Sequence, residues 1–280
     1  MAFERKWSIS SRRFNPDLLD RVARYSGHFF AFLLTVFLTA GLQSARAEPA
    51  HATFSLPDVW PWAYESEHGE QEGSLIALVK RLSELSGVPI RAELRPLRRV
   101  IREIRSGQVG FTFLFRSPEL DQAAVPVGKV IDVNLMLLAL ASTDYPLNLK
   151  ALAKERVAYI RGTYLGEAFE HDTTVVKVPV SSVGQAMDLL KMGRISAILA
   201  SDHNILRTIQ ARKLLFRQFR YEQHVAGQPA VLYRSAMGGH PAHAEKFADA
   251  LASMAQSGEL KQIFFGSDER MRASALLFAQ

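Results

Sequence analysis

The 280-residue sequence contains no cysteine. Disulfide bonds are therefore excluded, and the hydrophobic core alone has to stabilise the fold. No residue can carry a thioether-linked lipid anchor either. Apolar residues make up 48% of the chain and charged residues 22%, a composition typical of a globular protein.

The sequence also lacks a strong charge imbalance outside its first segment. The net charge is +6, but residues 1–47 hold seven Lys or Arg and three Asp or Glu. The remaining chain holds 27 basic and 25 acidic residues, a net charge of only +2. This balance argues against nucleic acid as a partner.

Only one long apolar run is present, and it lies near the N-terminus at residues 28–42. Arg21 and Arg24 precede this run, and Ala45-Arg46-Ala47 follows it. A basic segment, a short apolar core and an A-x-A site are typical of a secretory signal peptide. We therefore expect cleavage after Ala47 and a periplasmic mature chain, with an uncleaved anchor as the alternative. Arg12-Arg13 leaves twin-arginine export open beside the general secretory route.

Sequence signatures of catalysis and metal binding are missing. There is no G-x-S-x-G, no H-E-x-x-H and no phosphate-binding glycine loop. Ser201, Asp202 and His203 are adjacent, so they cannot converge as a triad. His240 and His243 have no carboxylate cluster near them in sequence, and metal sites need three or four ligands. We expect no catalytic residue, no metal and no cofactor.

What the sequence does contain is a repeated α/β pattern. Strands are predicted at 52–56, 88–94 and 108–115, with helices at 74–86 and from Leu97 to the stop at Gly107. Strands at 156–160, 175–178 and 195–200 surround a helix at 181–192. Each half predicts a parallel sheet flanked by helices.

The order of these segments predicts two lobes. Extended segments at 133–142 and 229–235 separate the halves, and helices at 242–257 and through Phe264 follow. We expect residues 1–47 to be the signal peptide, 48–138 and 232–280 to form lobe 1, and 139–231 to form lobe 2. Two crossings between lobes make a hinge with a cleft, where small ligands bind.

Six short motifs resemble, in order, those of the bacterial periplasmic solute-binding proteins of family 3, the polar amino-acid class. The motifs are Trp60-Pro61-Trp62-Ala63-Tyr64, Glu72-Gly73, Arg105-Ser106-Gly107-Gln108-Val109, Arg116-Ser117-Pro118-Glu119, Arg161-Gly162-Thr163-Tyr164 and Ser257-Gly258-Glu259-Leu260. The resemblance implies a two-lobed α/β fold of the type II periplasmic-binding-protein class. It also implies a small-molecule ligand, a monomer, and ABC transporter membrane subunits as partners.

The sequence departs from the family pattern at Leu120. The resemblance places there an arginine that grips the α-carboxylate of an amino acid, a contact that leucine cannot make. Arg116 stands four residues earlier and could supply the charge from another angle. The alternative is that Arg116 pairs with Glu119 or Asp121.

The predicted ligand-binding residues follow strand ends or lie in the aromatic loop. They are Trp60, Trp62, Tyr64, Phe115, Arg116, Ser117, Gly162, Thr163, Ser201 and Asp202. The structural alternatives are core packing for the rings, helix capping for Ser117 and Asp202, and an ordinary turn for Gly162 and Thr163. The resemblance assigns Asp202 or Ser201 to a ligand's ammonium group.

Arginines at 95, 98, 99, 102 and 105 dominate the second helix. Apolar residues at 97, 100, 101 and 104 take its inner face, so the arginines are expected to form a solvated face. Docking to an acidic partner is the alternative.

Together these features predict a periplasmic binding protein that delivers a small polar or anionic solute, an amino acid or an organic acid, to an ABC importer. It is not expected to be an enzyme. Two alternatives stay open: a periplasmic lyase or dehydratase on the same fold, and a ligand-sensing accessory protein.

Overall fold

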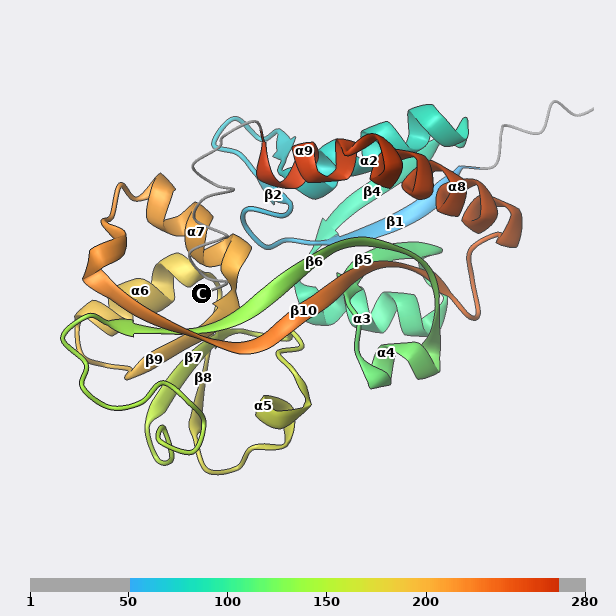
Figure 1. Ribbon diagram of the computed structural model, residues 1–280. Helices are drawn as coiled ribbons and strands as arrows, with labels where there is room; N and C mark the ends of the chain where they lie inside the picture. Colours follow the sequence, from blue (N-terminus) through green and yellow to red (C-terminus); the bar gives the residue numbers. More distant parts are fainter. Residues whose placement is uncertain (1–50, 267–280) are drawn as a thin grey trace, which may run out of the picture. The chain divides into compact units, whose positions relative to one another are not determined.

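The computed structural model describes residues 51–266. The predicted signal peptide and its cleavage site after Ala47 lie outside the described residues. Figure 1 shows the arrangement of the elements.

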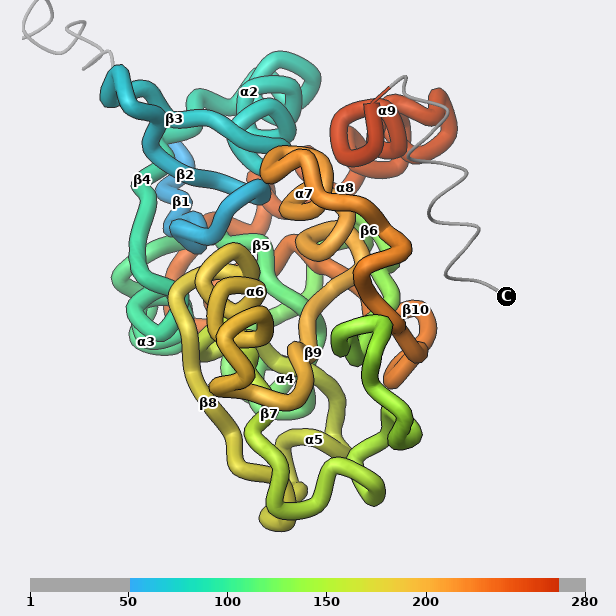
Figure 2. Tube along the Cα trace, turned by 90° about the vertical axis from the view of Figure 1, so that its left-hand side faces the viewer, coloured from blue at the N-terminus to red at the C-terminus, as the bar shows by residue number. Residues whose placement is uncertain are grey.

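Lobe 1 contains a parallel set of strands whose helices lie on its two faces. Strands β4 and β5 both pair with β1 in parallel. The lobe is built from β1 (Ala52–Pro57), β2 (Tyr64–Glu65), β3 (Gln71–Glu72), α2 (Ser74–Ser86), β4 (Ile90–Arg95), α3 (Leu97–Ser106), β5 (Phe111–Phe115), α4 (Pro118–Ala123), α8 (Pro241–Ser257) and α9 (Glu259–Phe265). Helices α8 and α9, the last along the chain, pack beside α2, the first (Figures 1 and 2).

Lobe 2 repeats the scheme with a second parallel set, in which β8 and β9 both pair with β7. It is built from β7 (Arg156–Ile160), α5 (Glu167–His171), β8 (Val176–Val180), α6 (Val183–Lys191), β9 (Ala197–Ser201), α7 (Asp202–Ala211) and the short 3-10 helix η1 (Phe216–Gln218). The two lobes confirm the predicted fold class.

Two long antiparallel strands, β6 (Ala124–Leu140) and β10 (Phe219–Ser235), run through both lobes (Figure 1). They join the two parallel sets into one sheet of order β4-β1-β5-β10-β6-β9-β7-β8. The chain therefore passes between the lobes twice, as predicted, and each passage lies within one continuous strand. The lobe boundaries at 138/139 and 231/232 stay a prediction.

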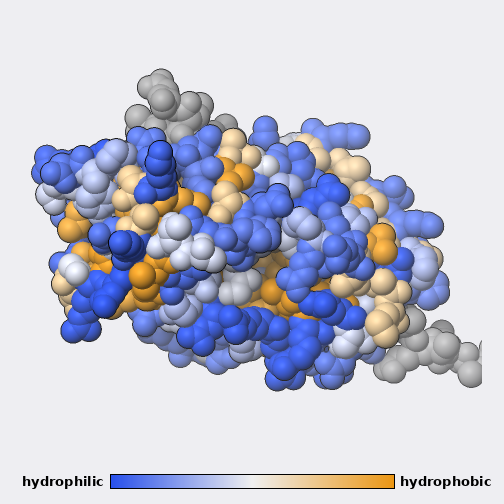
Figure 3. Space-filling view, turned by 90° about the horizontal axis from the view of Figure 1, so that it is seen from below, coloured by the Kyte–Doolittle hydropathy of each residue, from blue (hydrophilic) through white to orange (hydrophobic). Residues whose placement is uncertain are grey.

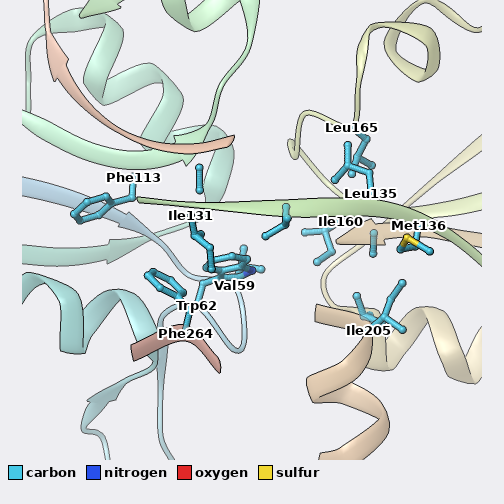
Figure 4. Close-up of a cluster of buried hydrophobic side chains, with 14 of the residues drawn as sticks. Val59, Trp62, Phe113, Ile131, Leu135, Met136, Ile160, Leu165, Ile205 and Phe264 are labelled. Carbon is cyan, nitrogen blue, oxygen red and sulfur yellow. The ribbon is translucent and has the colours of Figure 1, made fainter. Parts of the chain in front are cut away.

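Buried apolar side chains line both faces of this sheet. In lobe 1, Phe54 stacks on Phe111 at 5.2 Å between ring centroids, and Phe247 of α8 meets Phe111 edge-on at 5.0 Å. In β6, Leu135 to Ala139 are all buried. Figure 4 shows β6 passing from Ile131, beside Trp62, to Leu135 and Met136, near Ile205. Figure 3 shows one face of the molecule, on which apolar residues appear in patches among polar ones.

The two crossing strands are longer than predicted. The expected segments 133–142 and 229–235 correspond to β6 and β10, each of 17 residues. The helix predicted at 74–86 is confirmed as α2, which ends at Gly87 in the left-handed conformation.

Gly73, the residue before α2, packs closely against the backbone of Pro61 and Trp62, and a substitution tests this contact. Its φ is +115°, and a Cβ there would lie 2.5 Å from the carbonyl oxygen of Trp62. Gly69 also has a positive φ, +79°, but a Cβ there would meet nothing within 4 Å. We predict that Gly73→Ala destabilises the protein by about 3 kcal/mol and Gly69→Ala by about 1 kcal/mol. Urea denaturation measures both, and equal losses would contradict the backbone clash.

Candidate functional site

A cavity of about 780 Å³ lies where the carboxyl ends of both parallel strand sets meet. Strand β5 ends at Phe115, β7 at Ile160 and β9 at Ser201, and all three residues line it. Ligands of open α/β sheets bind at such carboxyl ends, because loops and helix starts converge there. Its volume lies in the range of small-molecule sites.

Six of the ten predicted site residues line this cavity together. They are Trp62, Phe115, Ser117, Gly162, Thr163 and Ser201. Trp60 and Tyr64 line a separate cavity of about 210 Å³. Arg116 and Asp202 line neither of these two cavities. The ligand-binding roles of all ten remain predictions.

Arg116 is held by a neighbouring carboxylate. Its Nε donates to Oδ2 of Asp121 at 2.8 Å, and this hydrogen bond raises the pKa of the guanidinium. Asp121 also accepts from the hydroxyl of Tyr233 at 2.7 Å. Asp121 is one of the two partners that the sequence offered as the alternative for Arg116. A ligand carboxylate would have to displace it.

Leu120 is part of an apolar cluster under α3. Its side chain is buried with Val100, Ile104, Leu114 and Tyr233. It also lines the cavity, so the wall there is apolar. Ser117 caps α4 by accepting the N–H of Leu120 at 3.3 Å, as its structural alternative predicted.

Asp202 is buried at the crossing strands rather than exposed to a ligand. Oδ2 accepts the backbone N–H and the side-chain amide of Asn134 in β6, both at 3.1 Å. Its Oδ1 accepts the N–H of His203 at 2.7 Å. Burial raises the pKa of this carboxyl, although the hydrogen bonds oppose the shift. Asp202 thus joins α7 to the hinge.

Asn204 connects the two lobes, and its place three residues after Ser201 was the only sequence signal for it. Its Oδ1 accepts the indole N–H of Trp62 from lobe 1 and the hydroxyl of Ser201 from lobe 2. Ser201 also caps α7 through the N–H of Asn204. One buried amide therefore ties the aromatic loop to the start of α7.

His203 lies beside this connection among aromatic rings. Its ring is 4.6 Å from that of Trp62 and 5.9 Å from that of Phe265, between centroids. Within residues 51–266 its Nδ1 has no hydrogen-bond partner. Burial, with a smaller contribution from the charge of Arg207, lowers the pKa of His203 to about 3.

Four of the five arginines of α3 and its approach are exposed, as predicted, whereas Arg95 is half-buried, and not all of the exposed ones face open solvent. Arg98, Arg102 and Arg105 line the cavity, at the spacing i, i+4, i+7. Arg99 instead donates to Glu103 at 2.6 Å, and Arg95 lies 3.6 Å from the same carboxylate. The prediction of a solvated face therefore missed that one side of this helix faces the cavity. The spacing of these three arginines, four and then three residues apart, was the sequence signal that places them on one side of the helix.

The buried Glu103 anchors α3 to the sheet. It accepts from the hydroxyl of Ser55 in β1 at 2.7 Å as well as from Arg99. Burial acts to raise its pKa, but these hydrogen bonds and the neighbouring arginines outweigh burial and lower it. The predicted inner face of α3 did not include this carboxylate.

Residues 51–266 contain no group of three or more His, Cys, Asp or Glu side chains placed to hold a metal ion. In the same part of the chain, no helix has the length and apolar content to cross a membrane.

Sequence comparisons find no matching family model and no matching curated protein. Comparisons of the fold find many solved structures. A histidine kinase sensor domain with similarity to periplasmic binding proteins matches with a TM-score of 0.68 and 17% identity, over 78% of this chain and 96% of the other. An ancestral arginine-binding protein bound to arginine matches with a TM-score of 0.66 and 16% identity, over 78% and 97%.

The substrate-binding protein of an ABC uptake transporter from Streptococcus pneumoniae, with bound histidine, matches with a TM-score of 0.66 and 14% identity, over 78% and 93%. The structural neighbours are consistently periplasmic binding proteins and substrate-binding proteins of amino-acid ABC transporters. At these identities the likeness establishes the fold, which is that of the periplasmic binding proteins.

His203 makes the stability depend on pH. Because its pKa falls from 6.5 in the unfolded chain to about 3 in the fold, its favourable contribution is complete above pH 6.5 and is lost as the pH falls towards 3. We predict that unfolding free energy falls by about 2 kcal/mol more between pH 7 and pH 5 in the wild type than in His203→Phe. Urea denaturation at both pH values measures this difference.

The comparison with His203→Phe isolates this one group. Asp202 has a raised pKa and acts with the opposite sign, and His224 and His243 have lowered pKa values. All three groups are present in both proteins, so their contributions cancel. Equal pH dependence of the two proteins would contradict a neutral buried His203.

Proposed function

We propose that this protein binds a small polar or anionic solute, an amino acid or an organic acid, between its two lobes. The observation that carries this proposal is the cavity of about 780 Å³, lined by Trp62 and Ser117 from lobe 1 and by Thr163 and Ser201 from lobe 2. A solute that contacts both lobes stabilises their closed arrangement, because it gains contacts only when they are together.

We further propose that the protein acts in the periplasm, as a monomer, and delivers its solute to the membrane subunits of an ABC importer. The N-terminal signal-like segment and the balanced charge of the remaining chain support this location. The structural neighbours support the transport role, since several are described as substrate-binding proteins of ABC transporters.

A sensing role is the second candidate. One neighbour is described as a histidine kinase sensor domain. Such a role would use the same cavity and the same closure, with a kinase rather than an importer as partner. A lyase or dehydratase is less favoured, because the neighbours are described as binding proteins.

Solute binding is tested by thermal melting of the purified protein after bound solute has been removed. We predict that one class within a panel of amino acids and organic acids raises Tm by about 5 to 10 °C at 100 times Kd. The stabilisation equals RT ln(1 + [L]/Kd), so the shift should grow with concentration. A panel without any shift would contradict the proposal.

Tryptophan fluorescence provides an independent check of where the solute binds. Trp62 lines the cavity, whereas Trp60 does not. The binding signal should therefore persist in Trp60→Phe and be lost or reduced in Trp62→Phe. Small-angle scattering with and without solute reports whether the lobes close.

A further inference from the structure

We propose that the solute is an organic acid with an apolar body, and that Arg98 and Arg102 of α3 bind its carboxylate. This inference rests on the proposed solute-binding function and narrows it to one chemical class. In this proposal the carboxylate of the solute binds to α3, and not to Arg116 or near Leu120.

The first observation is the arrangement of charge along α3. Arg98 and Arg102 are four residues apart, so their side chains lie on one face of the helix, and both line the cavity. Within residues 51–266 neither guanidinium forms an ion pair or a side-chain hydrogen bond. Arg105, the next residue on this face, pairs with Glu119. Two residues that line the cavity therefore carry a guanidinium group that is not paired with a carboxylate.

The second observation is the closeness of lobe 2 to Arg98. A Cβ added to Gly162 would lie 3.1 Å from Cγ of Arg98 and 3.5 Å from Cγ of Leu97. Thr163, the next residue, lines the cavity with them. An anion held by Arg98 would thus lie beside the loop of lobe 2, where it can affect closure.

The third observation concerns the ammonium group of an amino acid. Asp202 is occupied by Asn134 and His203 and does not line the cavity. Of the two carboxylates that do, Glu119 is paired with Arg105, and Glu170 accepts the N–H of Leu165 at 3.1 Å. Of the two carboxylates that line the cavity, only Glu170 is not paired with an arginine, whereas two arginines that line it have no carboxylate partner. The unpaired charge at the cavity is therefore mainly positive.

The remaining wall is mainly apolar and aromatic, and it comes from both lobes. Its members include Val59, Trp62, Ile101, Phe115, Leu120 and Tyr159. A solute that fills this space needs an apolar body, because a polar body would lose its hydrogen bonds to water there. Charge at one end and apolar surface elsewhere describe an amphiphilic acid.

A matched series of probes tests separately whether binding needs a carboxylate and whether it disfavours an ammonium group. The purified protein is titrated with 3-phenylpropanoate, with 3-phenylpropanamide and with L-phenylalanine, and binding is followed by calorimetry. The three probes share one body and differ in the charge or in the added ammonium group. We expect 3-phenylpropanoate to bind at least 10-fold more tightly than either of the others. A second series of 4-methylpentanoate and L-leucine covers an aliphatic body.

Single substitutions identify the anchor. We expect Arg98→Gln and Arg102→Gln each to weaken carboxylate binding by about 10- to 100-fold, the effect of losing one charge-assisted hydrogen bond. The exposed Arg91→Gln serves as the matched control and should leave binding unchanged, whereas Arg116→Gln tests the alternative anchor. All four side chains lie at the surface, and melting of the unliganded variants checks that each one folds.

The outcomes distinguish this inference from the proposed function. Binding of L-phenylalanine or L-leucine as tight as that of the acids, or a loss of binding in Arg116→Gln alone, would overturn the α3 anchor but leave solute binding intact. Failure of both acids, with binding of other amino acids in the melting panel, would do the same. Failure of every probe and every panel member would overturn both.

Discussion

The antiparallel pairing of β6 with β10 is the interaction on which the rest of the structure depends. Each parallel strand set pairs with one of these strands: β5 of lobe 1 with β10, and β9 of lobe 2 with β6. The pairing shifts register at four places between Gln223 and Tyr233, where bulges bend and twist the strands. The pairing therefore directs the carboxyl ends of both strand sets towards one cavity. The positions of the site residues at these strand ends depend on it.

Polar groups, of which Asp202 and Gln228 are buried, hold the crossing at the same point. Asn134 in β6 donates to Asp202 and accepts the N–H of Gly227 from the bulged part of β10. Nearby, the side chain of Gln228 donates to the carbonyl of Arg116 at 2.8 Å. Leaving a buried carboxylate or carbonyl without a hydrogen bond would destabilise the fold by more than each hydrogen bond stabilises it. These groups therefore favour one arrangement of the crossing strands. The same hydrogen bonds explain why Asp202 has a structural partner.

Local signals in the sequence were sufficient for most helices and for the strand ends, but not for the hinge or the whole site. Gly87 and Gly107 end their helices in the left-handed conformation, as their place after apolar periodicity indicated. In β6 and β10, Pro126 and Gly227 resemble strand breakers, and only the pairing of two distant segments overrides them. Five of the six predicted cavity residues were found at or just after strand ends, and the sixth, Trp62, was found in the aromatic loop. Arg98 and Arg102 were missed, because periodicity shows that a face is exposed but not whether it faces bulk water or a cavity.

The charges around α3 are only partly balanced by carboxylates. Five arginines within 11 residues would repel one another, and an unpartnered helix of this kind would be held weakly against the sheet. Glu103 compensates Arg95 and Arg99 on the inner side and ties the helix to Ser55 of β1, while Glu119 compensates Arg105. Two arginines remain uncompensated, and both lie on the side that lines the cavity. An anionic solute would complete this balance, which couples the stability of the helix to occupation of the cavity.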